Sequence, residues 1–224
     1  MTDDAADLLA RRLRTPRSAA VAGVVFAVLL GTSYVLIRLS IPADPTAEEE
    51  WLENHRSTVT FALSLVPFAG IAFLWFMGVI RDRLGELEDR FFATVLLGSG
   101  LLFLAMTFAA TAIGGGMLAT YEVEPAGMVE SVLYSFSRNT MYRIANVFAI
   151  RMASVFMISM GTIWLRTRTM PRSLAVITYA VALVLMVSVS YSLWIVLLFP
   201  AWVAVISVYI LSGNLRSGRL PDPR

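Results

Sequence analysis

Long apolar runs separated by short polar segments set the pattern along this chain of 224 residues. A helix needs about 20 apolar residues to cross a bilayer, where every backbone polar group must be satisfied within the helix. The last apolar stretch is about twice that length, and we divide it at the polar residues near 190. The pattern predicts an all-α polytopic membrane helical bundle with six transmembrane helices. The expected spans are 19–39, 58–80, 91–118, 141–165, 173–189 and 193–211.

Polar segments flank this expected transmembrane domain of residues 19–211. Residues 1–18 combine leucines at helical spacing with four arginines. They predict either an amphipathic helix on the inner membrane surface or a solvated leader whose arginines fix the topology. Residues 212–224 are polar and contain two glycines and two prolines, which predicts a disordered tail.

The arginines predict the orientation of the bundle. All 18 basic residues are arginine, and 13 of them fall in the two terminal segments and in the connections 81–90 and 166–172. Six spans would bring these four segments to one side, and an excess of basic residues marks the cytoplasmic side. Both termini are therefore predicted to be cytoplasmic. The use of arginine without lysine is typical of a GC-rich bacterial genome, so we expect a multi-pass protein of the bacterial plasma membrane.

The fourth predicted span contains the polar residues that we consider first as a site. Arg151 falls near the middle of the span, after Arg143 and Asn146, and we take the two arginines as the charged residues within the predicted spans. A guanidinium at mid-bilayer costs ~2.5–3.5 kcal/mol on insertion scales, so it is expected to face a bundle interior, a wet cavity or a partner. Glu130, in the preceding loop, is the preferred carboxylate partner for Arg143, and Arg151 is the second choice. These four residues form either a ligand-binding site or a structural contact between helices.

Glycine and proline mark candidate hinges in three spans. Pro67 is expected to kink the second span, and Pro200 is expected to bend the last one. Gly114, Gly115 and Gly116 mark where the long third span would break. Carbonyl groups freed at such a break would be acceptors for a guanidinium. The alternative is that the glycines mark an ordinary helix end in the headgroup region.

The composition removes several kinds of chemistry. The chain has no cysteine and a single histidine, His55, so it offers no disulfide, thiolate ligand or cluster of histidines within one chain. We expect no metal and no cofactor, and the sequence shows no recognisable catalytic set.

Two stretches carry a resemblance to a known group of proteins. Residues 73–95 read FLWFMGVIRDRLGELEDRFFATV, and residues 151–172 read RMASVFMISMGTIWLRTRTMPR. They resemble segments of uncharacterised six-helix integral membrane proteins of actinobacteria and related bacteria. The resemblance implies a six-helix membrane fold and brings no activity or site residue with it.

These observations favour a non-enzymatic integral membrane protein, a partner subunit or a lipid-binding scaffold. One alternative is a transporter or channel for small anions or lipids that uses the intramembrane arginine. Another is a membrane enzyme acting on lipid headgroups, which would require His55 and the loop carboxylates to converge. The expected partners are membrane lipids and either another membrane protein or a second copy of the chain. No nucleic-acid partner is expected.

Overall fold

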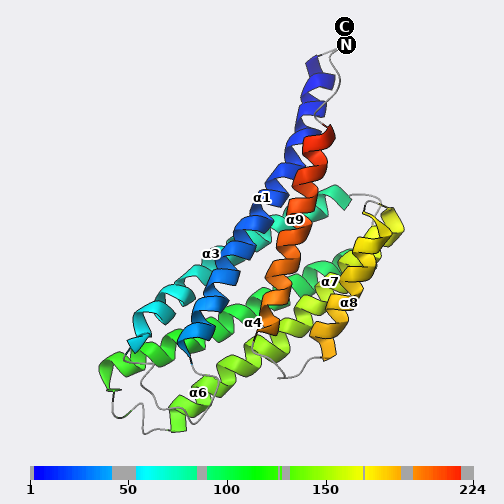
Figure 1. Ribbon diagram of the computed structural model, residues 1–224. Helices are drawn as coiled ribbons and strands as arrows, with labels where there is room; N and C mark the ends of the chain where they lie inside the picture. The colour runs from blue at the N-terminus through cyan, green and yellow to red at the C-terminus, as the bar shows by residue number, and fades with distance from the viewer. Residues whose placement is uncertain are drawn as a thin grey trace.

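The computed structural model describes residues 3–41, 54–84, 90–125, 127, 132–168, 170–187 and 194–217, and these form an all-helical bundle without strands (Figure 1). The prediction of an all-α fold is confirmed. The first helices are α1 (Asp3–Ser40), α3 (Arg56–Leu84) and α4 (Arg90–Val123). A second group comprises α6 (Val132–Arg143), the π-helical segment η2 (Ile144–Ala149), α7 (Ile150–Thr167), α8 (Arg172–Val187), the 3₁₀ turn η3 (Ile195–Leu197) and α9 (Leu198–Ser217).

Five helical stretches in the described part of the chain are long and apolar enough to cross a membrane, as in a multi-pass membrane protein. They are Ser18–Ser40, Arg56–Arg81, Phe91–Val123, Val132–Thr167 and Ile195–Ser212. The sixth apolar helix, α8, has 16 residues. At ~1.5 Å per residue it is about 24 Å long, shorter than the ~30 Å of a typical hydrocarbon core. Five of the six predicted spans are therefore long enough to cross a typical bilayer.

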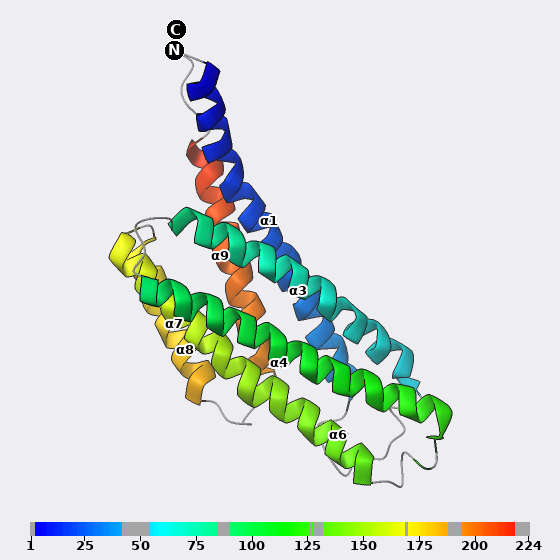
Figure 2. The same cartoon turned by 180° about the vertical axis from the view of Figure 1, so that it is seen from behind.

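The helix α1 packs between α3 and α9 (Figures 1 and 2). On the other side of α3 lies α4, and α6 and α7 pack against α4. The helix α8 packs mainly against α7. The start of α1 and the end of α9 lie at one end of the bundle, on the side where α3 ends and where α7 turns into α8. The opposite end holds the end of α1, the start of α3 and the end of α4.

Two apolar clusters fill the bundle. The larger one contains six phenylalanines that are at most 1% exposed, with neighbouring ring centroids 4.7–6.4 Å apart. They are Phe26, Phe73, Phe76, Phe103, Phe156 and Phe199. The smaller cluster lies where α1 ends, and includes Ile41, Leu63, Ala110 and Met141. Burial of these side chains holds α1, α3, α4 and α7 together.

The prediction that the glycine triplet breaks the third span is wrong. The helix α4 continues through Gly114, Gly115 and Gly116 to Val123. A glycine inside a helix costs ~1 kcal/mol, whereas each backbone group left unsatisfied in a bilayer costs several kcal/mol. Gly114 instead permits a close helix contact, because a Cβ atom there would lie 2.8 Å from the sulfur of Met141. Whether these glycines act as a hinge stays a prediction.

The fourth span also begins earlier than expected. The elements α6, η2 and α7 form one continuous stretch, Val132–Thr167, instead of a span over 141–165. The expected outer loop between the third and fourth spans covered residues 119–140. Because α4 ends at Val123 and α6 begins at Val132, the loop is shortened to the residues between 123 and 132. The polar residues at both ends of that loop continue the helices, so a hydropathy boundary is not a helix boundary.

The two candidate proline hinges have different positions in their helices. Pro67 lies inside α3, which continues past it to Leu84. Pro200 is the third residue of α9, in the turn where backbone N–H groups have no partner within the helix. Pro200 therefore lies at the start of the last helix and not at a bend within it.

The terminal segments differ from their predicted boundaries. Residues 3–18 and the first span form the single helix α1, so the expected leader is not a separate element. At the other terminus α9 continues to Ser217, six residues past the predicted end of the last span. The rest of the predicted tail lies outside the described residues.

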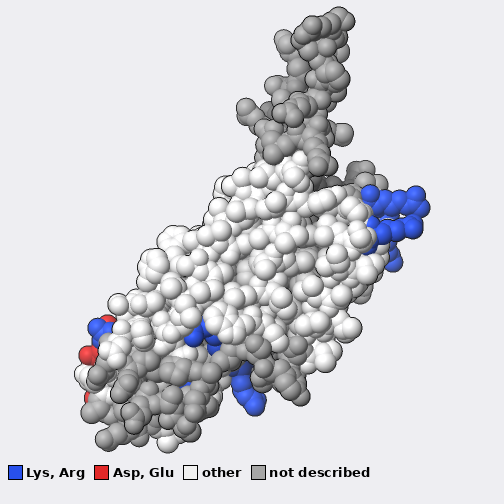
Figure 3. Space-filling model, viewed as in Figure 1, with Lys and Arg blue, Asp and Glu red and all other residues white. Residues whose placement is uncertain are grey.

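Charge on the described surface gathers near the ends of the bundle (Figure 3). On the face shown, arginine atoms lie over the connection between α7 and α8, and acidic and basic atoms mix near the start of α3 and the end of α4. Arg56 and Glu122 form an ion pair of 3.5 Å between these two helix ends. Most of the surface in between is uncharged, as in a helix bundle surrounded by lipid.

Candidate functional site

The structure does not join the predicted site residues into one cluster through any described contact. Arg143 is exposed, whereas Asn146 and Arg151 are partly buried. The Arg151 guanidinium donates from Nη1 to the carbonyl oxygen of Val147, one turn earlier in its own helix, at 3.0 Å. Glu130 lies outside the described residues, so its expected pairing stays a prediction.

The helix around Asn146 is widened into the π-helical segment η2. The side-chain Nδ2 of Asn146 donates to the carbonyl oxygen of Tyr142 at 2.8 Å. In a regular α-helix that carbonyl would accept from the backbone N–H of Asn146, so the side chain competes with the helical hydrogen bond. Widened turns of this kind are frequent at functional sites. The side chains that contact Asn146 are therefore candidates for a functional site.

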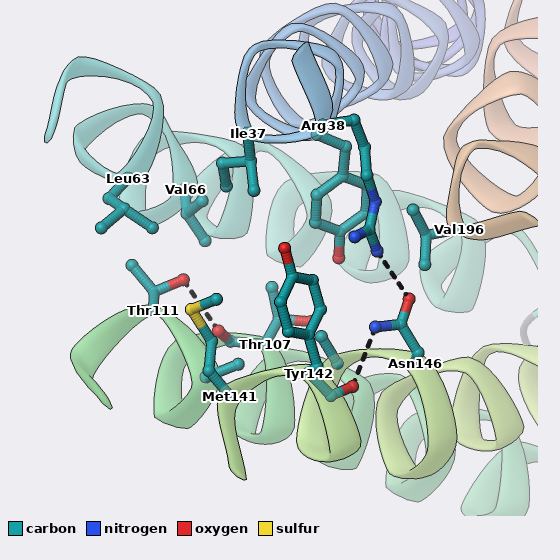
Figure 4. A pocket seen from close by; sticks show the side chains of 13 residues that line it. Ile37, Arg38, Leu63, Val66, Thr107, Thr111, Met141, Tyr142, Asn146 and Val196 are labelled. Atoms are coloured by element: carbon teal, nitrogen blue, oxygen red, sulfur yellow. Dashed lines mark hydrogen bonds between the residues drawn. The ribbon is translucent and has the colours of Figure 1, made fainter. Parts of the chain in front are cut away.

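Asn146 contacts Arg38, which lies in the last turn of α1. The Nη2 atom of Arg38 donates to Oδ1 of Asn146 at 2.9 Å (Figure 4). The amide orientation follows from chemistry, because a guanidinium only donates and the Tyr142 carbonyl only accepts. Both ends of the Asn146 amide are thereby used, and they fix the guanidinium against the fourth span.

The ring of Tyr142 completes this group of residues, which we call the Arg38 cluster: Arg38, Tyr142 and Asn146. The Cζ atom of Arg38 lies 4.9 Å from the centre of the Tyr142 ring, and that of the buried Arg138 lies 5.6 Å from it. Both distances are within the range of cation–π attraction. Two positive groups therefore gather around one ring.

A cavity of about 40 Å³ lies beside the Arg38 cluster. It is located where the two apolar clusters meet, since residues of both line it. In Figure 4 the Tyr142 side chain extends from the fourth span toward α1, and its hydroxyl points into this space. The polar residues that line it are Tyr34, Arg38, Thr107, Thr111, Tyr142 and Asn146.

Two buried polar atoms of the cluster have no hydrogen-bond partner among the described residues. They are Nη1 of Arg38 and the hydroxyl oxygen of Tyr142. The hydroxyl groups of Thr107 and Thr111 donate to carbonyl oxygens of their own helix, at 2.8 and 2.9 Å. Because Arg38 and Tyr142 also interact with each other, the cavity offers a guanidinium N–H beside a hydroxyl that can donate or accept.

The assumption that Arg143 and Arg151 are the charged residues of the predicted spans is wrong. Arg38 falls within the predicted first span, 19–39, and the structure brings it into contact with Asn146. The sequence contains a signal for it: Tyr34 and Arg38 are four residues apart, so they share a helix face in the last turns of an apolar run.

Of the residues required for the enzyme alternative, His55 and Glu122 lie at the same end of the bundle and are exposed, whereas most of the loop carboxylates, Glu130 among them, lie outside the described residues. His55 is adjacent to Arg56, whose partner Glu122 lies one residue before the end of α4. In the described part of the chain, no group of three or more histidine, cysteine, aspartate or glutamate residues is placed to hold a metal ion.

Comparisons with protein-family models, curated proteins and solved structures find no match to this chain.

Proposed function

We propose that this protein is a non-enzymatic component of the bacterial plasma membrane, a scaffold for lipids or a partner subunit, without a transport path of its own. The observation that carries the proposal is the closed aromatic core. Six fully buried phenylalanines fill the space among α1, α3, α4, α7 and α9. A polar solute crossing this bundle would have to displace a packed apolar core, which is costly in free energy.

Arg151 fits this proposal better than it fits the transport alternative. A transport role would place its guanidinium at the end of a polar path through the membrane. Its described hydrogen bond instead goes to the Val147 carbonyl in its own helix. Such a bond gives the guanidinium an acceptor within its own helix and requires no polar group in the neighbouring core.

The proposed topology has six crossings with both termini in the cytoplasm. The start of α1 and the end of α9 lie at the same end of the bundle, which requires an even number of crossings (Figure 1). The short helix α8 then supplies the sixth. The connection between α7 and α8 carries Arg166, Arg168 and Arg172, and the excess of arginine identifies this end as cytoplasmic.

Introduced cysteines test the topology, because the chain has no natural cysteine. On spheroplasts, an impermeant thiol reagent is expected to label cysteines at Glu49, Glu124 and Ser190. Cysteines at Gly85, Thr169 and Ser217 are expected to stay unlabelled until the membrane is opened. Labelling of all three inner positions, with protection of all three outer ones, would reverse the orientation.

A cysteine in the core tests the absence of a transport path. Ala153 is fully buried in the larger cluster, and Ala153→Cys adds only one atom. We expect no reaction with a small polar thiol reagent from either side of the membrane, and full reaction after denaturation in detergent. The Glu124→Cys variant is the reactive control. Labelling of Ala153→Cys in the native membrane would favour transport over a scaffold.

A further inference from the structure

We infer that the Arg38 cluster is a binding site for a single oxyanion, a phosphate or carboxylate group, which a lipid headgroup or a free anion can supply. The site is distinct from the one expected around Arg151. It consists of a guanidinium from α1 and a phenol from the fourth span, which contact each other and both line one cavity (Figure 4).

The charge requirement comes first. Arg38 is partly buried between helices, and no carboxylate among the described residues contacts it. A buried charge is costly unless it is paired and hydrogen-bonded, and a guanidinium has donors only. A group that accepts hydrogen bonds and carries negative charge would therefore complete the site.

The geometry of the donors fits one such group. Nη2 of Arg38 is held by Asn146 at 2.9 Å, and the guanidinium lies over the Tyr142 ring, so its remaining atoms have a fixed direction. The buried Nη1 atom and the buried Tyr142 hydroxyl both lack partners among the described residues, and both residues line the cavity. Charge-assisted hydrogen bonds from a guanidinium suit the oxygens of phosphate and carboxylate groups.

The size of the cavity limits the ligand to one small group. One water needs ~10–15 Å³ of such space, and about 40 Å³ is present. That space accommodates the oxygens of one phosphate or carboxylate but not a sugar or a whole lipid. Apolar side chains, including Leu63, Val66 and Met141, line the rest of it, which suits an anionic group whose remaining part lies outside the cavity.

The position along α1 is consistent with a lipid source. Arg38 is two residues from the end of the membrane-spanning stretch Ser18–Ser40. In a membrane this residue lies close to the phosphate groups of one leaflet, within reach of a headgroup. The assignment of the site does not rest on the proposed scaffold function, and a transporter with this cavity would bind the same group.

Tyr142→Phe is the informative variant, because it keeps the ring beneath Arg38 and removes only an unpaired hydroxyl. The free protein is expected to be as stable as the wild type or slightly more stable, whereas anion affinity falls roughly tenfold, the effect of one hydrogen bond to a charged group. Tyr179→Phe is the matched control. Its hydroxyl is 2.7 Å from Oγ1 of Thr162, away from the cavity, so its loss should lower stability without changing anion affinity. Arg38→Lys keeps the positive charge but removes the planar guanidinium, whose N–H groups can donate two parallel hydrogen bonds to one anion. This variant should weaken anion binding more than Tyr142→Phe does.

The test uses the full chain purified in a neutral detergent, with native mass spectrometry and thermal unfolding. The added probes are phosphatidylglycerol, uncharged diacylglycerol and inorganic phosphate. Stabilisation and one retained phosphatidylglycerol, without a phosphate effect, would identify a lipid headgroup. Stabilisation by inorganic phosphate would identify a free oxyanion. Either result supports the site if Tyr142→Phe weakens the effect and Tyr179→Phe does not. No anion effect, or an equal effect in wild type and Tyr142→Phe, would overturn the inference.

Discussion

The contact between α1 and α9 provides a sharp test of the packing. A Cβ atom added at Gly23 would overlap Oγ of Ser207 and would lie 2.8 Å from Cδ2 of Phe76. Gly31 is eight residues further along the same helix, and a Cβ atom there meets nothing within 4 Å. Gly23→Ala and Gly31→Ala therefore make the same chemical change on one helix, in a crowded and in an open position.

The magnitude follows from two terms. Alanine is favoured over glycine in a helix by up to ~1 kcal/mol, and this term is common to both variants. Overpacking at Gly23 costs ~1–3 kcal/mol. Ser207 can change rotamer, but Phe76 is fully buried against Phe73 and has little room to move. The difference between the variants is therefore the overpacking term itself, or about 2–12 °C in Tm at ~2–4 °C per kcal/mol for a chain of this size.

Thermal unfolding of both variants in one detergent measures this difference. Gly31→Ala is expected to be as stable as the wild type or more stable, and Gly23→Ala less stable than Gly31→Ala. Adding Ser207→Gly to Gly23→Ala removes one of the two overlapping groups and should recover part of the loss. Equal Tm values for Gly23→Ala and Gly31→Ala would show that α1 and α9 do not approach each other as closely as described.

Two further substitutions test individual polar contacts. Arg151→Leu is expected to leave Tm in detergent unchanged, because the described hydrogen bond of the guanidinium lies within its own helix and does not join two helices. A clear drop in Tm would indicate a partner on another helix. Thr178→Val is expected to destabilise by ~1–3 kcal/mol, because Trp202 Nε1 donates to Oγ1 of Thr178 at 2.9 Å in a buried position. Thr178→Ser keeps the acceptor as a control, and equal unfolding of the valine and serine variants would contradict the proposed packing of α8 against α9.

The apolar pattern predicted most of the helices but not their ends. The second expected span, 58–80, agrees closely with the apolar stretch Arg56–Arg81, because charged residues bound it on both sides. The third and fourth spans were predicted too short, since helices continue into residues that are polar enough to leave the membrane. The length of an apolar run indicates which part of a helix lies within the bilayer. The hydrogen bonding of the backbone, in contrast, decides where the helix ends.

Glycine and proline were poor predictors of helix ends in this chain, although they often mark helix ends in soluble proteins. Gly114, Gly115 and Gly116 do not interrupt α4, and Pro67 does not end α3. In lipid an interrupted helix has no water to satisfy its backbone, so continuation is favoured even at residues with low helix propensity. Such residues report on helix contacts, as Gly23 and Gly114 do, more than on helix ends.

The difference between Arg151 and Arg38 explains why the sequence alone ranked Arg151 first as a candidate site. Arg151 was ranked first because it is predicted to lie near the middle of the bilayer, where the free-energy cost of a charged side chain is greatest. This cost does not indicate which groups accept hydrogen bonds from the guanidinium. For Arg151 one acceptor is the Val147 carbonyl, four residues away in the same helix. Arg38 lies near the edge of its span, where a charge costs less, yet its partner Asn146 is 108 residues away. Because the Nη1 atom of Arg38 is buried without a partner among the described residues and its one described hydrogen bond reaches another helix, Arg38 is the better candidate for a binding site.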